Sequence, residues 1–182
     1  MIGKTSISAV HGWQSDANRW NIRIGITDMK SPKENLMLGW REWVALPDLG
    51  IRQIKAKVDT GARTSALHAF KIRSFQDGDQ ERVEFLMHPV QKDNDTVITC
   101  VADVLDKRTV TDSGGHKEER FVIRTNLAIG KYSWPIEVTL TARDDMLFRM
   151  LLGRTAIKKI AQVDPARSYL VGKKKRITEG GQ

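Results

Sequence analysis

One carboxylate stands at the end of an alternating apolar run. The stretch IKAKVDTGARTSALHA, residues 54–69, places Asp59 directly before Thr60 and Gly61. Asp begins many β-turns and Gly supplies positive φ, so Asp-Thr-Gly can simply reverse the chain after a strand. A carboxylate held at a tight turn can also act as a general acid or base. The tripeptide by itself leaves both interpretations open.

Four other side chains could bind a metal ion if the fold brought them together: His68, His88, Cys100 and His116. Their spacing has no local zinc signature, and neither His-Glu-x-x-His nor Cys-x-x-Cys occurs. The sequence also lacks the Gly-x-x-x-x-Gly-Lys-Ser/Thr pattern of a nucleotide-binding loop. We therefore predict no metal and no cofactor, and we interpret each of the four as a strand or loop residue.

The elements that must position Asp59 are mostly strands. Apolar residues alternate with polar ones in residues 54–59 and again in residues 82–90, which is the period of a half-buried strand. Residues 96–105 are β-branched on both faces and predict a fully buried strand. Residues 119–142 predict two strands joined near Gly130. One apolar face is expected in the second of them, from Trp134, Ile136, Val138 and Leu140.

Helical periodicity is scarce in this chain. The best helix candidate is short, RTAIKKIA at residues 154–161, directly after MLLG. Many short strands followed by one late helix predict an all-β barrel or sandwich-like domain. With 182 residues, the chain has the length of one domain.

Composition divides the chain into three parts. Residues 1–36 are polar without a clear period and read as an N-terminal extension or linker. Apolar residues become dense at Met37, so we place the folded domain at residues 37–172. Residues 173–182 form a basic tail. No run of residues is apolar enough to be a signal peptide or a membrane span, and we expect a cytoplasmic protein.

The net charge of +8 belongs mainly to the ends of the chain. Residues 1–36 contribute +2 and residues 158–182 contribute +5, which leaves +1 for the region between them. The run GKKKR, residues 172–176, could contact RNA, a ribosome or an acidic partner. We favour a solvated tail over these contacts.

The order of motifs along the chain resembles the retropepsin-like aspartic proteases. KVDTGA at residues 57–62 is followed by DSGG at residues 112–115, a hairpin over residues 119–142, and MLLGRTAI at residues 150–157. A closer resemblance covers residues 39–172, through GWREWVALP, AKVDTGARTSALHA, ERFVIRT, MLLGR and SYLVG. These motifs resemble the bacterial family labelled ATP-dependent zinc protease, also described as retropepsin-like proteins associated with an ATP-grasp ligase that adds glutamates to a ribosomal protein.

The resemblance implies a closed retropepsin-like β-barrel, the acid protease fold, with one short C-terminal helix. It also implies a homodimer, since aspartic-protease chemistry uses two carboxylates that share a proton and this chain has one Asp-Thr-Gly. Asp59 would be catalytic, Thr60 would brace the elbow through its hydroxyl, and the Gly61 N–H would approach the carboxylate. Support is expected from Ala62, Gly153 and Arg154, and a substrate-covering flap from Ser113, Gly114, Gly115 and His116.

Arg63 departs from the family pattern. In many retropepsins an acid at this position pairs with the arginine that corresponds to Arg154. Two arginines would repel, so either the dimer is built differently or another acid intervenes. A cation beside Asp59 would also favour its ionised form over the shared-proton state.

Two classes of function follow from the resemblance. The first is a homodimeric aspartic endopeptidase, a hydrolase that cleaves a peptide or a glutamate-modified protein tail. The alternative is a non-catalytic peptide-binding or adaptor module that docks on an ATP-grasp ligase or a ribosomal protein. The family label also names zinc and ATP. Because the sequence has no motif for either, ATP dependence would have to come from a partner.

Overall fold

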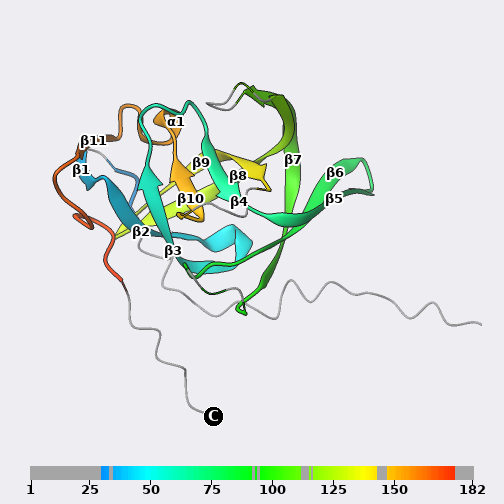
Figure 1. The fold of residues 1–182 in the computed structure, drawn as a ribbon, viewed down its shortest axis with the longest axis horizontal. Coiled ribbons are helices and arrows are strands. Elements are labelled where there is room, and N and C mark those ends of the chain that lie inside the picture. Colours follow the sequence, from blue (N-terminus) through cyan, green and yellow to red (C-terminus); the bar gives the residue numbers. More distant parts are fainter. Residues whose placement is uncertain are drawn as a thin grey trace, which may run out of the picture.

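The fold was analysed in a computed structural model that describes residues 30–32, 35–91, 93, 95–111, 115, 117–142 and 147–174. Strands dominate this part of the chain (Figure 1). They are β1 (Leu36–Gly39), β2 (Arg41–Leu46), β3 (Ile51–Val58), β4 (Ser65–His68), β5 (Phe70–Asp77), β6 (Gln80–Met87), β7 (Ile98–Thr111), β8 (Lys117–Ile129), β9 (Tyr132–Thr141), β10 (Met150–Leu152) and β11 (Ala161–Asp164). A 3-10 helix, η3 (Pro47–Leu49), and one α-helix, α1 (Arg154–Ile157), accompany them. The prediction of an all-β fold with one short helix is confirmed.

Six of the strands form a ring. The main sheet runs in the order β2-β3-β10-β4-β9-β8-β7-β6-β5, and β2 also pairs with β8 through Ala45 and Ala128. The short strand β10 lies between β3 and β4, parallel to β3 and antiparallel to β4. The chain leaves β3, crosses the end of β10 and enters β4. The Asp-Thr-Gly segment is this crossing.

The core lies where the apolar faces of these strands meet. The predicted face of β9 is confirmed, because its four apolar side chains are at most 6% exposed. The alternation predicted for β6 is also confirmed, with Val83, Phe85 and Met87 fully buried. The prediction of a strand buried on both faces at residues 96–105 is wrong, since only Cys100 and Ala102 are buried there.

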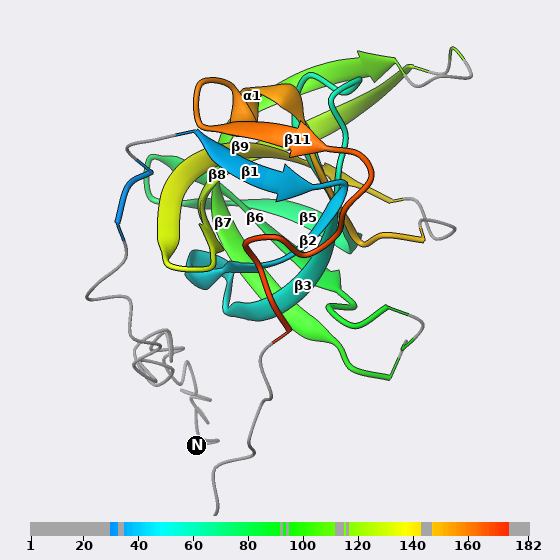
Figure 2. The ribbon, with the colours of Figure 1, turned by 90° about the vertical axis from the view of Figure 1, so that its left-hand side faces the viewer.

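Strands β7 and β8 form the longest hairpin of the fold. Their register runs from Val104 opposite Ile123 to Thr111 opposite Lys117. Figure 2 shows the far end of this hairpin projecting from the body of the molecule, on the side where α1 lies. One face of β7 therefore stays in solvent, which explains why its β-branched residues are not buried on both sides.

The segment that follows β11 completes the side of the ring where β2 and β8 diverge. Tyr169 donates its backbone N–H to the carbonyl of Arg41, and Trp43 donates to the carbonyl of Gly172. The side chain of Glu42 is fully buried beneath this segment. Its carboxylate accepts hydrogen bonds from the backbone N–H groups of Gly39, Leu170, Val171 and Gly172, at 2.8 to 3.4 Å.

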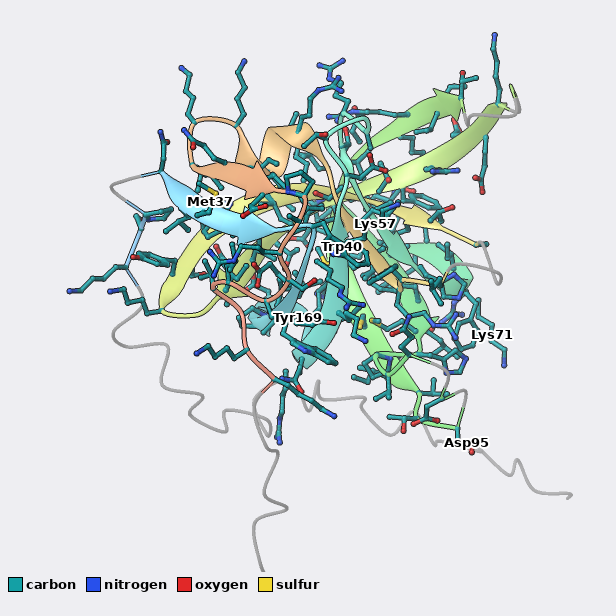
Figure 3. All side chains as sticks on the ribbon, turned by 60° about the vertical axis from the view of Figure 1, so that its left-hand side comes forward. Met37, Trp40, Lys57, Lys71, Asp95 and Tyr169 are labelled. Carbon is teal, nitrogen blue, oxygen red and sulfur yellow. The ribbon has the colours of Figure 1, made fainter. Side chains whose placement is uncertain are left out.

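Aromatic side chains flank Arg41 beside the same segment. The guanidinium of Arg41 lies 4.4 Å from the ring of Trp40 and 5.1 Å from the ring of Tyr169. Figure 3 shows Trp40 and Tyr169 on one side of the molecule, where the C-terminal segment crosses. We call residues 165–172 the C-terminal clip.

The helix is shorter than its sequence pattern predicts. Residues 154–161 were expected to be helical, but α1 ends at Ile157. Lys159 adopts a positive φ of 65°, and Ala161 begins β11, which pairs in parallel with β1. In the part of the chain that the structure describes, no helix is long and apolar enough to span a bilayer.

Candidate functional site

The segment Asp59–Thr64 forms an elbow between β3 and β4. The Asp59 backbone N–H donates to the carbonyl of Leu152 at 2.8 Å, which fixes the start of the turn on β10. The Asp59 carboxylate then bends back over its own chain. Its Oδ1 accepts hydrogen bonds from the N–H groups of Gly61 at 3.0 Å and Ala62 at 3.1 Å. This is the side-chain turn that an Asp favours.

The geometry leaves the other oxygen of Asp59 available. The side chain is half-buried, and Oδ2 receives no hydrogen bond from any described residue. Gly61 lies against the carboxylate as the Asp-Thr-Gly pattern implies, since its Cβ position would be only 3.2 Å from Oδ1. The Thr60 side chain is exposed and makes no hydrogen bond to a described residue, so the bracing role expected of its hydroxyl stays a prediction.

Arg154 holds the elbow from α1. Its Nη1 donates to the carbonyl oxygens of Thr60 and Gly61, both at 2.8 Å. Its backbone N–H donates to the carbonyl of Ala62 at 2.9 Å. The guanidinium thus donates its hydrogen bonds to backbone carbonyls of its own chain. Within one chain, Arg154 therefore has acceptors without an acid at position 63.

Gly153 allows α1 to approach this closely. A Cβ added to Gly153 would lie 2.5 Å from the carbonyl carbon of Thr64, a distance at which atoms overlap. The Gly153 N–H also donates to the buried hydroxyl of Ser65 at 3.2 Å. Gly153 has an extended backbone, so it is required for space and not for an unusual φ.

A groove of about 880 Å³ begins beside the elbow. Gly61, Ala62, Arg63 and Thr64 form one wall, and residues 108–111 of β7 form another. The floor includes Pro135, Glu137 and Thr139, which share one face of β9. Asp59 adjoins the groove through these elbow residues and is not itself part of the lining.

The predicted flap corresponds to the end of the β7–β8 hairpin. Gly115 is exposed there and adopts a positive φ of 83°, which suits a glycine at a turn. Ser113, Gly114 and His116 lie outside the described residues. The hairpin that leads to them contributes Thr109, Val110 and Thr111 to the groove wall.

Four arginines line the groove. Arg108 is paired with Glu137 at 2.7 Å and with Asp106 at 2.6 Å. Arg120 is 8% exposed and pairs with Glu118 at 2.7 Å. Arg63 and Arg124 are exposed and form no ion pair with a described residue.

The groove is therefore cationic as far as the described residues line it, since Glu137 is the only acid among them. Sequence reasoning missed these arginines. Arg120 and Arg124 fall on one face of β8, and in the sequence that face looks like an ordinary solvated one. Only the pairing of β8 with β7 and β9 reveals that it faces a groove.

The three described residues among those considered as metal ligands have other surroundings. Cys100 is buried and donates its thiol to the carbonyl of Leu49, while the ring of His88 stacks on Phe70 with centroids 4.7 Å apart. His68 is buried in β4, and His116 lies outside the described residues. No group of three or more His, Cys, Asp or Glu side chains among the described residues could hold a metal ion. The donors present thus do not fit the zinc site that the family label implies.

One family model matches this chain over residues 37–174, and it is described as RimB-like, retropepsin-like aspartic endopeptidase RimB. Curated proteins named probable alpha-L-glutamate ligase are also similar. The protein from Desulfotalea psychrophila is 48% identical over 136 residues, which cover 75% of this chain and 29% of that protein. The protein from Shewanella pealeana is 43% identical over 138 residues, which cover 76% of this chain and 30% of that protein.

This chain therefore spans less than a third of the length of the curated relatives it matches. Among solved structures, the Legionella pneumophila protein Lpg0085, of unknown function, is similar with a TM-score of 0.64 and 27% identity. That similarity covers 75% of this chain and 98% of the Legionella chain.

Proposed function

Because this chain belongs to the RimB-like family of retropepsin-like aspartic endopeptidases, we propose that it is a homodimeric aspartic endopeptidase. Each chain supplies one Asp59, and the ring of six strands serves as the closed barrel of the acid protease fold. The observation that supports this best is the elbow itself. One oxygen of Asp59 is held by two backbone N–H groups, and the other is left available beside a groove.

The chemistry requires a second carboxylate. The acid that lines the groove, Glu137, is already paired with Arg108, so a second copy of Asp59 is the natural source. A symmetric, isologous dimer brings the same residue of both chains to its axis. The exposed Thr60 hydroxyls would then lie near the axis and could bond across it.

The reaction follows from a shared proton. The ionised carboxylate takes a proton from water while the protonated one donates to the carbonyl oxygen of the peptide, so that a C–O bond forms and a tetrahedral diol results. Breakdown of the diol cleaves the C–N bond as the carboxyl that received the proton from water donates it to the leaving amine. The other carboxylate takes the proton of one diol hydroxyl as the C=O bond re-forms. The pair then again holds one proton between its two carboxylates.

The groove favours an acidic substrate, and we propose a glutamate-modified protein tail. Carboxylates of such a tail would bind Arg63 and Arg124, which have no acidic partner among the described residues. Arginine suits this task because its planar fork can bind a carboxylate through two hydrogen bonds. The names of the curated relatives, which refer to glutamate ligation, agree with a substrate that carries added glutamates.

The relatives also support a second candidate function. Their names describe a ligase, and this domain accounts for 29% of the Desulfotalea protein. A domain that accompanies a ligase could hold the acidic product without cleaving it, as a peptide-binding or adaptor module that acts with an ATP-grasp ligase or a ribosomal protein. In this case ATP would be used by the ligase and Asp59 would be a structural turn residue.

The Asp59→Asn variant distinguishes the two functions. Asparagine keeps the shape of the side chain but cannot act as a base, so cleavage of a reporter peptide with a glutamate tail should fall about 10³-fold. Wild-type activity should depend on pH as a bell-shaped curve. Asp95→Asn serves as the matched control, since Asp95 is an exposed acid in a surface turn. Undiminished cleavage by Asp59→Asn would rule out the mechanism, and binding without cleavage by the wild type would favour the adaptor.

A further inference from the structure

A second hollow shares one lining residue with the groove. It has a volume of about 400 Å³ and is lined by η3, β6 and residues 101–105 of β7. Arg124 of β8 lines both hollows. Strand β7 also runs from one to the other, because residues 108–111 belong to the groove wall. The two hollows therefore share the side chain of Arg124 as a common lining residue.

The two hollows differ in charge. Among the described residues, the charged side chains that line the groove are four arginines and one glutamate. The second hollow is lined by Arg82 and Arg124 together with Asp48 and Asp103, so its charges balance. Arg82 is paired with Asp103 at 3.1 Å and with Asp77 at 2.9 Å. The second hollow therefore has little net positive charge with which to bind an acidic ligand.

Many of the other side chains that line the second hollow are apolar. Leu105 lines the second hollow and is 48% exposed, so its apolar surface is accessible to a ligand. Val101 and Val104 line it as well and are half-buried. Such a surface gains free energy when apolar atoms of a ligand cover it.

We propose that the second hollow is a distal subsite that binds an uncharged, partly apolar stretch of the same protein substrate whose acidic stretch occupies the groove. This inference rests on the proposed function. Residues in an extended peptide follow one another at about 3.3 Å, so a substrate of several residues can reach across Arg124 into both hollows. The site then recognises the junction between a protein and its glutamate tail, and it discriminates against free polyglutamate.

Binding by the Asp59→Asn protein tests this without interference from cleavage. The probes are an all-glutamate peptide and equally long peptides that are half glutamate and half leucine and serine, in both orders. Fluorescence anisotropy gives the dissociation constants. Leu105→Thr places a residue with good strand propensity at this position but removes apolar contact. The matched control is Val97→Thr, because Val97 is 45% exposed and lines neither hollow.

We expect one of the mixed peptides to bind more tightly than the all-glutamate peptide. Leu105→Thr should weaken the binding of that mixed peptide about fivefold and leave the all-glutamate peptide unchanged. Val97→Thr should change neither, and Arg124→Gln should weaken both. Thermal melts verify that each variant folds.

Equal effects of Leu105→Thr on both kinds of peptide, or no preference for a mixed peptide, would overturn the distal subsite. These outcomes are separate from failure of the proposed function. That failure would appear as absent cleavage by the wild-type protein, whatever the binding pattern of the Asp59→Asn protein.

Discussion

Asp59 and Arg154 are connected through the backbone of the elbow. The carboxylate accepts two N–H groups from residues 61 and 62, and the guanidinium donates to two carbonyls from residues 60 and 61. The peptide units around Gly61 are thus held from both sides. The orientation of Asp59 depends on this arrangement, because the carboxylate itself has no side-chain donor among the described residues.

We expect Arg154→Lys to weaken the two hydrogen bonds that the guanidinium donates to the elbow. Lysine keeps the positive charge but presents a single flexible ammonium, which holds two carbonyls less rigidly. The turnover number for an acidic peptide should fall about tenfold, with little change in KM and a loss of about 1 kcal/mol in the free energy of unfolding. Arg52→Lys, on an exposed position of β3, is the control. Full activity in Arg154→Lys would show that the elbow does not need this support.

Cys100 provides a second test at the level of one residue. Burial raises the pKa of the Cys100 thiol to about 12. Because the thiolate is the reactive form, the folded protein should resist alkylation at pH 8, and the protein unfolded in urea should react at the rate of a free thiol. Rapid modification of the folded protein would contradict the burial of Cys100.

The same pKa predicts how stability depends on pH. The unfolded chain releases the Cys100 proton near pH 9, the ordinary value for a thiol, whereas the folded chain retains it up to about pH 12. Raising the pH between these values therefore favours the unfolded state. The free energy of unfolding should fall more steeply with pH in the wild type than in Cys100→Ala, as urea titrations at several pH values would measure.

Among the elements, the C-terminal clip and strand β2 depend on each other. The Glu42 carboxylate is buried, and it accepts hydrogen bonds from backbone N–H groups of residues 39 and 170–172. A buried carboxylate without such donors would be costly, and the donors would lack acceptors without it. Gly172 fits against β2 only because it has no Cβ, which would lie 1.9 Å from the carbonyl oxygen of Trp43.

Glu42→Gln should therefore destabilise the protein by about 2 to 4 kcal/mol. The glutamine amide would direct its own N–H₂ group at backbone donors, which leaves buried groups unsatisfied. Urea unfolding measures the loss. Glu84→Gln is the control, because Glu84 forms only an exposed pair with Arg73, and such pairs contribute little. Equal stability of Glu42→Gln and the wild type would contradict the clip.

On the scale of the whole molecule, the elements with local patterns could be predicted from the sequence. Alternation identified β3, β6 and β9, and Asp-Thr-Gly after β3 marked the elbow. Strands β4 and β10 are too short to show a period, and they are defined by pairing with strands distant in the chain. Glutamate is usually a surface residue, so the sequence does not indicate that Glu42 is buried. Its burial follows from the C-terminal clip, which packs over it.

The site was predictable at the elbow and not in the groove. The elbow lies within one continuous segment, so its residue types and spacing were sufficient to locate it. The groove joins β7, β8, β9 and the elbow, whose residues are separated by long intervals of sequence. Its cationic character follows from strand pairing, which alternation within a single strand does not specify.

The proposed dimer is the central claim at this scale, because the proposed mechanism needs two carboxylates and each chain would supply one Asp59. Mixing wild-type and Asp59→Asn chains, with exchange ensured by co-refolding, tests it most directly. If every active site needs an Asp59 from each chain, activity per total protein falls as the square of the wild-type fraction, to about one quarter in an equal mixture. Activity that falls in simple proportion, to about one half, would show that each chain acts alone and would contradict the shared site.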